Sequence, residues 1–258
     1  LLLVLLLVLL LLVLLLLLLR YRTRLTDIWA GANAAPRSQT PDMGWNSWNH
    51  FGGSVSAAVM REATDQFVAL GLREAGYVYI NSDDEWSELN RSASGRLVPK
   101  ASFGGEGGMR NLSAYIHARG LKFGLYGAAA QTTCGGSAGG LYHEQAYAQT
   151  LREWEVDYFK YDNCGMINIQ SYAKYQTFRD ALNRTGRHIV YSFEPHQRPH
   201  VYAWNKLVGN SWRTGNDIGA DYRRIFANLV ANNLWAGVTG KGAWGDADML
   251  EVGNPGLS

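Results

Sequence analysis

The sequence is poor in several features that would assign a protein class directly. Its two cysteines are too few for a disulfide scaffold but allow one bridge, and six prolines beside 29 glycines indicate tight loops rather than a low-complexity linker. The 24 Lys and Arg residues nearly balance 22 Asp and Glu residues, so the formal charge of +2 gives no electrostatic footprint for nucleic acid. No G-x-G-x-x-G sequence follows the first predicted strand, which argues against a Rossmann-type nucleotide site.

Aromatic and aliphatic residues, by contrast, are abundant. Nine Trp, fourteen Tyr and eight Phe residues lie in a chain that is 47% hydrophobic, and this drive for burial excludes disorder over most of the length. A chain of 258 residues can form one large domain with a sizeable core, including an α/β barrel.

The N-terminal segment differs in composition from the rest of the chain. Residues 1–19 are all Leu or Val, and arginines follow at positions 20, 22 and 24. The run is close in length to the ~20 residues of a transmembrane helix and longer than the ~7–15 residues of a signal-peptide core. The arginines that follow it favour a cytoplasmic position for that flank, which argues against secretion. Ala32-Asn33-Ala34 has the form of a cleavage site, and the absence of an initiator Met also fits an incorrectly assigned gene start. Among these alternatives we favour an export signal.

Three N-glycosylation sequons, at Asn90, Asn111 and Asn183, fit an exported chain. Together with the one bridge that two cysteines allow, they favour a secreted protein or one of the secretory pathway. Anchoring through the apolar run would be the only contact with a membrane. We therefore separate residues 1–35 from the folded domain, residues 36–258.

Short apolar runs alternate with helical patterns from residue 40 onward. The runs are typical of buried parallel strands, the seventh being weaker, and they span residues 43–48, 77–81, 121–126, 157–161, 189–193, 207–213 and 234–244. Apolar residues at spacings of three and four predict helices around residues 55–70, 109–116, 172–182 and 225–230. Helix stops are predicted at Gly71, Gly120 and Gly186.

Repeated βα units form either an open doubly wound sheet or a (β/α)8 barrel. Polar residues follow nearly every predicted strand, as at Asn46, Asp83, Asp162, Glu194 and Asp246. A doubly wound sheet concentrates its chemistry at one switch point, whereas barrel enzymes distribute it over the C-terminal ends of many strands. The sequence therefore predicts an α/β fold of the (β/α)8 TIM-barrel class.

The ends of the fourth and sixth predicted strands carry a pair of acids. Asp162 and Asp217 each follow a cation by two or four residues, and alternate barrel strands point into one layer, so both carboxylates can face one pocket. Carboxylates about 5–5.5 Å apart would suit a retaining glycosidase, one as nucleophile and one as acid/base. An ion pair or two solvated surface carboxylates would leave the same pattern.

Two alternatives use neighbouring residues. Lys160 could form an imine with a carbonyl substrate, although a lysine two residues from a carboxylate more often forms its ion pair. The acidic pairs Asp83-Asp84 and Asp246-x-Asp248 could bind a hard cation. The lack of a His cluster and the aromatic surroundings favour sugar hydroxyls over a metal.

Five ordered motifs between residues 41 and 256 resemble those of the family 27 glycoside hydrolases, best known for α-galactosidases and α-N-acetylgalactosaminidases. They are MGWNSWN at 43–49, NSDD at 81–84, KYDNC at 160–164, SWR at 211–213 followed by Asp217, and DADMLEVGN at 246–254. The resemblance implies a retaining exo-glycosidase that hydrolyses terminal non-reducing α-D-galactosyl residues of oligosaccharides or glycoconjugates. It implies no metal or organic cofactor.

The resemblance also implies roles for individual residues. Asp162 is similar in position to the family nucleophile, and Asp217 to the acid/base, which starts the cycle protonated and so needs a less cationic or more buried setting. Lys160 and Arg213 would donate hydrogen bonds and hold Asp162 ionised. The other pocket residues implied are Trp48, Asp83, Asp84, Tyr126 and Met249.

The cysteines fit the same resemblance. Cys134 and Cys164 correspond to a family disulfide beside the pocket, with two buried free thiols as the weaker alternative. Many members carry a second bridge near the first two strands, whose expected positions here are Gly53 and Glu85.

Two loops depart from the family pattern. Where α-galactosidases usually have Cys-Glu-Trp, with an acid that reads the galactose 2-position, residues 191–197 are YSFEPHQ, so either Glu194 takes the acidic role or the loop is rebuilt. This stretch is not small enough for an acetamido group, which disfavours α-N-acetylgalactosaminides and favours an α-galactoside or the isosteric β-L-arabinopyranoside. Residues 127–130 are GAAA instead of Ser-Asp-Ala-Gly, which removes a carboxylate.

Family barrels continue beyond the last motif into an eighth strand and a β-sandwich domain. We therefore interpret residues 36–258 as a partial glycosidase barrel of about seven βα units from a longer protein. A catalytically silent carbohydrate-binding fragment is the alternative function. The joint presence of Asp162, Asp217, Lys160 and Arg213 favours the enzyme.

Overall fold

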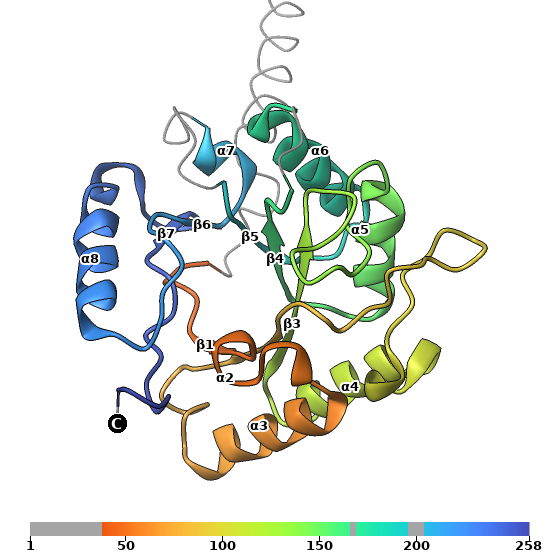
Figure 1. The fold of residues 1–258 in the computed structure, drawn as a ribbon, viewed down its shortest axis with the longest axis horizontal. Helices are drawn as coiled ribbons and strands as arrows, with labels where there is room; N and C mark the ends of the chain where they lie inside the picture. Colours follow the sequence, from red (N-terminus) through yellow and green to blue (C-terminus); the bar gives the residue numbers. More distant parts are fainter. Residues whose placement is uncertain (1–37, 166–168, 196–203, 258) are drawn as a thin grey trace, which may run out of the picture.

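Seven parallel strands in chain order form the sheet of the computed structural model, which describes residues 38–165, 169–195 and 204–257 (Figure 1). The strands are β1 (Gly44–Asn46), β2 (Tyr79–Ser82), β3 (Lys122–Ala128), β4 (Tyr158–Asp162), β5 (Val190–Phe193), β6 (Ser211–Arg213) and β7 (Trp244–Asp246). Each neighbouring pair is parallel, so all the strands end at the same edge of the sheet. This succession confirms the predicted α/β barrel class, with seven strands and a helix in each of the six connections between them.

Helices connect successive strands. They are α2 (Trp48–Phe51), α3 (Ala57–Ala69), α4 (Gly108–His117), α5 (Glu144–Glu153), α6 (Ser171–Arg184), α7 (Asn205–Val208) and α8 (Tyr222–Asn233), with short 3-10 turns at Gly52–Ser54, Ala101–Phe103, Gly105–Gly107 and Ala236–Val238. The predicted stops are confirmed, because Gly71, Gly120 and Gly186 have φ angles of 71°, 73° and 69°. Such left-handed conformations end helices and favour glycine.

Alternation along β4 separates the core from the interior of the barrel. Phe159 and Tyr161 stack on Phe178 of α6, with ring centroids 5.1 and 4.1 Å apart. Because successive side chains of a strand point to opposite faces, Lys160 and Asp162 face the barrel interior. The apolar packing of one face thus positions the polar residues of the other.

Two predicted strands were wrong in detail, and one helix was missed. The expected strand at residues 207–213 is divided, since Leu207 and Val208 belong to α7 and only Ser211–Arg213 is strand; the expected strand at 234–244 begins only at Trp244. Short apolar runs fit a helix or a strand equally well, which explains these errors. Helix α5 was not predicted, because its only fully buried apolar residues are Tyr147, Ala148 and Leu151.

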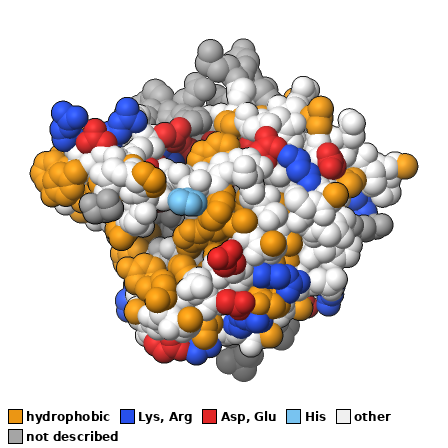
Figure 2. Space-filling model, turned by 60° about the horizontal axis from the view of Figure 1, so that its bottom comes forward, with side chains coloured by type: hydrophobic (Ala, Val, Ile, Leu, Met, Phe, Trp, Pro, Cys, Tyr) orange, Lys and Arg blue, Asp and Glu red, His pale blue; other side chains and the backbone are white. Residues whose placement is uncertain are grey.

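Helix α8 has the predicted type but not the predicted burial. Its apolar face is largely exposed, including Phe226 (58%), Leu229 (48%) and Val230 (53%), and Leu234 just beyond it is 84% exposed. Figure 2 shows hydrophobic side chains gathered on the side of the molecule where Figure 1 places α8. The amphipathic pattern therefore predicted a buried face that the described residues do not cover.

Within the described residues, no helix has both the length and the apolar character needed to cross a bilayer. The apolar run at residues 1–19, with its alternative interpretations, lies outside the described residues.

Asp42, just before β1, is a partly buried acid whose Oδ2 atom is shielded from solvent. Its Oδ2 atom accepts no hydrogen bond from the described residues. Burial, reinforced by the negative charge of Asp246 and opposed by Lys122, raises the pKa of Asp42 to about 7. An unfolded Asp has a pKa of about 3.9, so the folded protein binds the extra proton and loses stability as pH rises from about 4 to about 7.

We predict that Asp42→Asn will stabilise the protein, and by more at pH 8 than at pH 5. The amide keeps the shape of the protonated acid and removes the charge, so we expect a gain of about 1–4 kcal/mol at pH 8. Thermal unfolding of both proteins at the two pH values measures the difference. An equal gain at both would contradict the assignment.

Candidate functional site

The carboxylate of Asp162 lies buried at the end of β4. Its Oδ2 accepts a hydrogen bond from the Tyr126 hydroxyl at 2.7 Å, and its Oδ1 accepts one from the backbone N–H of Asn163 at 2.6 Å. Burial, followed by the charge of Asp162, raises the pKa of Tyr126 above its usual range. The phenol therefore remains a hydrogen-bond donor to the carboxylate.

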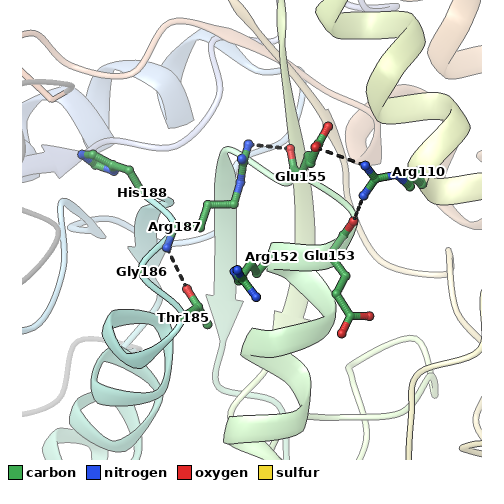
Figure 3. Close-up of a pocket in the computed structure, with 8 residues that line it drawn as sticks. All are labelled: Arg110, Arg152, Glu153, Glu155, Thr185, Gly186, Arg187 and His188. Carbon is green, nitrogen blue, oxygen red and sulfur yellow. Dashed lines mark hydrogen bonds and ion pairs between the residues drawn. The ribbon is translucent and has the colours of Figure 1, made fainter.

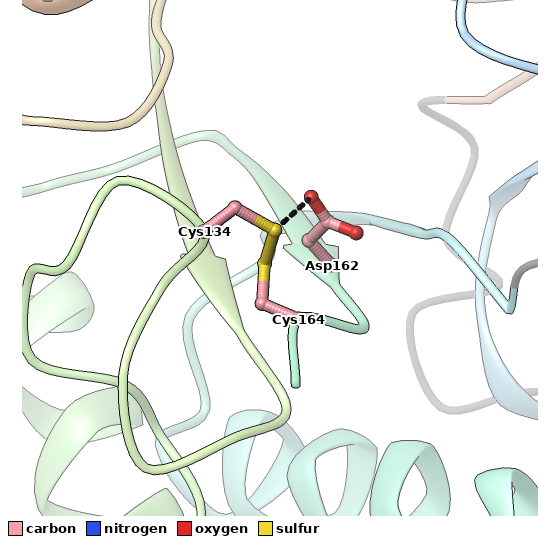
Figure 4. Close-up of side chains that lie close together, drawn as sticks. All are labelled: Cys134, Asp162 and Cys164. Carbon is pink, nitrogen blue, oxygen red and sulfur yellow. Dashed lines mark hydrogen bonds between the residues drawn. A yellow bond between two sulfur atoms is a disulfide. The ribbon is translucent and has the colours of Figure 1, made fainter. Parts of the chain in front are cut away.

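A disulfide between Cys134 and Cys164 lies beside this carboxylate, and the predicted pairing is thus present (Figure 4). The Cys134 Sγ atom is 3.8 Å from Asp162 Oδ2. A bridged sulfur carries no proton, so this approach is a van der Waals contact rather than a hydrogen bond. The disulfide attaches the loop after β3 to the end of β4 without adding a charge beside Asp162.

Lys160 forms an ion pair with Asp83 across the interior. Its Nζ is 3.0 Å from Asp83 Oδ2, which also accepts a 2.7 Å hydrogen bond from Asn46 Nδ2. Burial lowers the pKa of Lys160, but the charges of Asp83, Glu194 and Asp162 outweigh it and leave the pKa above its usual value. A permanently protonated amine is a poor nucleophile, which argues against the imine alternative.

Asp84, next in the chain, holds a loop. Its Oδ2 accepts from the N–H of Gly135 at 2.6 Å and its Oδ1 from that of Glu85 at 2.7 Å. Burial raises its pKa, opposed by these bonds and one from Thr133. Asp84 therefore fixes the loop that carries Cys134.

Arg213, at the end of β6, contacts three acids at once. Its guanidinium lies 3.3 Å from Glu194 Oε2, 2.9 Å from Asp217 Oδ1 and 3.0 Å from Asp248 Oδ2. Burial lowers its pKa, but Glu194 and Asp248 outweigh burial and raise it. Burial, followed by the charge of Asp162, raises the pKa of Glu194 to about 7 despite its ion pair.

Asp217 does not have the setting that we expected for an acid/base. Its side chain is 81% exposed and is ion-paired with Arg213, whereas we expected a more buried or less cationic position. The residue follows β6 by four positions, in the loop that leaves the end of the strand. The expectation failed because position relative to a strand end does not fix the depth of a loop residue.

The remaining predicted pocket residues lie after the two end strands. Trp48 begins α2, is 40% exposed and donates its backbone N–H to Asn46 Oδ1 at 2.9 Å. Met249 is partly buried in the loop after β7.

In the described residues the acidic pairs considered as cation ligands contact other groups of the protein. The one group of three candidate ligands found among the described residues is Cys134, Asp162 and Cys164, whose sulfurs are bonded to each other. Asp248 is engaged by Arg213 and by the N–H of Ile218 at 2.8 Å. Sequence reasoning missed Asp248 as a partner of Arg213 and Asn46 as a partner of Asp83. The registers of adjacent strands would have identified Asn46 once the strand ends were known.

The two positions expected for the second bridge, Gly53 and Glu85, lie close together in the structure. A Cβ atom on Gly53 would lie 3.9 Å from Glu85 Cβ, which is a normal disulfide spacing. Glu85 instead pairs with Lys100. The two predicted positions are therefore adjacent, and an ion pair occupies the place of the bridge.

A separate pocket of about 810 Å³ lies near the N-terminal ends of β4 and β5, away from these acids (Figure 3). Two of its arginines already donate hydrogen bonds to other groups of the protein. Arg187 donates to the carbonyls of Val156 and Glu155 and to Asp157, and Arg110 donates to the Glu153 carbonyl. We assign the candidate site to the C-terminal edge of the sheet instead.

The sequence and the fold are similar to those of known proteins. A family model described as "Alpha galactosidase A" matches residues 40–258. Alpha-galactosidase 3 of Arabidopsis thaliana is 42% identical over 221 residues, which cover 86% of this chain and 50% of that protein. Alpha-galactosidase I of Mortierella vinacea superposes with a TM-score of 0.81 at 31% identity, covering 86% of this chain and 62% of that chain. The α-galactosidase of Saccharomyces cerevisiae solved with raffinose has a TM-score of 0.79 at 33% identity, covering 86% and 55%.

The chain thus spans about half the length of the curated relatives that it matches. The matched region includes every strand and every predicted site residue. The chain therefore belongs to the alpha-galactosidase family, family 27 of the glycoside hydrolases.

Proposed function

We propose that this protein is a retaining exo-glycosidase that removes terminal non-reducing α-D-galactosyl residues from oligosaccharides or glycoconjugates. The observation that carries the proposal is the buried Asp162 carboxylate. Tyr126 donates a hydrogen bond to it, and its charge is close enough to Lys160 to help raise the pKa of the lysine. The names of its relatives support the substrate, and one of those relatives was solved with raffinose.

In the proposed reaction Asp162 is the nucleophile. Its carboxylate bonds to the anomeric carbon while the bond to the leaving oxygen breaks, and Asp217 gives that oxygen a proton. Asp217, then ionised, takes a proton from water, and the water oxygen displaces Asp162 from the anomeric carbon. Galactose leaves with retained configuration, and both acids return to their starting states.

Asp217 must carry a proton at the first step although it is exposed in the free chain. A sugar bound against it would remove water and favour the neutral acid. Arg213 keeps Glu194 and Asp248 as partners when Asp217 is protonated, so its charge remains compensated.

The sugar preference rests on the loop after β5. Glu194 lies buried at the strand end and is held by Arg213, where a carboxylate would accept a hydrogen bond from a 2-hydroxyl. We therefore rank α-galactoside first and β-L-arabinopyranoside second. An α-N-acetylgalactosaminide is disfavoured because its acetamido group would meet Glu194; His196 and Gln197 lie outside the described residues.

We predict that the 258-residue chain releases nitrophenol faster from the α-galactoside than from matched β-L-arabinopyranoside and α-N-acetylgalactosaminide substrates. The Asp162→Asn variant serves as the control, since the amide preserves shape but cannot attack. It should lose turnover by a factor of about 10⁴ or more with unchanged circular dichroism. Full activity of that variant would refute the nucleophile, and inactivity of a folded wild-type chain would favour the silent carbohydrate-binding alternative.

Asp217→Ala should affect substrates with poor leaving groups most. A nitrophenolate leaves without protonation, whereas an alkoxide leaving from an oligosaccharide needs the acid. We expect kcat/KM to fall by about 10²–10⁴ for an oligosaccharide such as raffinose, and by much less in the bond-breaking step with nitrophenyl galactoside. Equal losses for both substrates would rule out the acid role.

We further propose that the chain enters the secretory pathway and carries a glycan at Asn90. Asn90 is exposed in a loop and Asn111 is exposed on α4, whereas Asn183 is half-buried in α6 with its Oδ1 shielded from solvent. An attached glycan needs space outside the fold, so we expect one at the exposed Asn90 and none at the half-buried Asn183. The protein secreted from a eukaryotic host should therefore have a lower molecular mass, by one glycan, in the Asn90→Gln variant. The Asn183→Gln variant should not show this loss. Intact-mass spectrometry before and after glycosidase treatment tests both expectations.

A further inference from the structure

Side chains, rather than strand pairing, connect the first and last units at the C-terminal edge of the sheet. Strands β1 and β7 occupy opposite ends of the strand order in the described sheet. Glu251, in the loop after β7, accepts a hydrogen bond from Asn49 Nδ2 of α2 through Oε1. Its Oε2 accepts a second from Asn254 Nδ2 at 3.1 Å.

His50 of α2 completes the connection. Its Nδ1 atom lies 3.1 Å from Asn254 Oδ1, so two adjacent residues of α2 contact two residues of the last loop. We call Asn49, His50, Glu251 and Asn254 the seam clasp. Glu251 is its central member, because it bonds to both asparagines and is only 9% exposed.

The clasp holds a loop in an unfavourable backbone conformation. Asp248 and Glu251 have φ angles of 73° and 53°, in the left-handed region that residues other than glycine rarely adopt. Such conformations persist where surrounding contacts hold them. Arg213 and the N–H of Ile218 hold Asp248, and Asn49 holds Glu251, so Met249 lies in a segment fixed at both ends.

Helix α2 is held by the same contact, in addition to the bond from the Trp48 N–H to Asn46 Oδ1 at its start. It has only four residues, none of them fully buried, so apolar packing does little to fix its position. Trp48 is its first residue and is adjacent to Asn49. The seam clasp therefore joins the segments that carry Trp48 and Met249, the two predicted sugar contacts from opposite ends of the sheet.

We propose that Glu251 is a positioning residue for the sugar pocket. It sets the loop carrying Met249 against the helix carrying Trp48, and so closes the pocket where β1 and β7 do not pair. This inference rests on the proposed function, since the pocket that it positions is the galactose site.

The test is a double-mutant cycle on the full chain, with nitrophenyl α-galactoside as substrate. Glu251→Ala should lower kcat/KM by about tenfold to a hundredfold, chiefly through KM, because the sugar contacts are displaced while Asp162 is unchanged. Glu251→Gln retains one acceptor oxygen and should fall between wild type and Glu251→Ala. Asn49→Ala should reproduce the loss, and the double variant should be no worse than either single variant. Glu62→Ala, an exposed change on α3, is the matched control.

The outcomes separate this inference from the proposed function. If wild type is active and Glu251→Ala has the same KM and kcat, the inference fails and the proposed function stands. Losses that multiply in the double variant would also overturn it. So would a lower melting temperature with unchanged kinetics of the folded fraction, because Glu251 would then be merely structural. An inactive folded wild type overturns both.

Discussion

The acids in the interior of this barrel depend on two cations, Lys160 and Arg213. Burying a carboxylate without a partner is costly, and each acid of the interior is less than a tenth exposed. Lys160 and Arg213 compensate four of them, namely Asp83, Asp162, Glu194 and Asp248. The acids outnumber these two cations, and burial, followed by the charge of Asp162, raises the pKa of Glu194 to about 7.

The surroundings of Asp162 stabilise a carboxylate. Tyr126 donates to one oxygen, the Asn163 N–H donates to the other, and the neighbouring disulfide contributes bulk without charge. Asp84 supports this arrangement indirectly, since it binds the loop of Cys134 and not Asp162 itself.

Much of the fold could be predicted from the sequence because the buried strands are short, apolar and followed by polar residues. Periodicity located the core of all six stronger strands, and the glycine stops were correct. It failed at residues 207–208 and 234–243, where an apolar run does not distinguish helix from strand. The family resemblance placed Lys160 and Asp83 in one pocket and paired Cys134 with Cys164. It did not predict that Lys160 pairs with Asp83, that Asp217 is exposed or that Arg213 bonds to Asp248. Those contacts depend on loop geometry, which the motifs leave undetermined.

Arg213 couples the protonation of its three acids. When Glu194 binds a proton, its attraction for Arg213 weakens, and the guanidinium can interact more strongly with Asp217 and Asp248. A proton on Glu194 therefore changes how the guanidinium is shared among its partners, and one of those partners, Asp217, is the proposed acid/base.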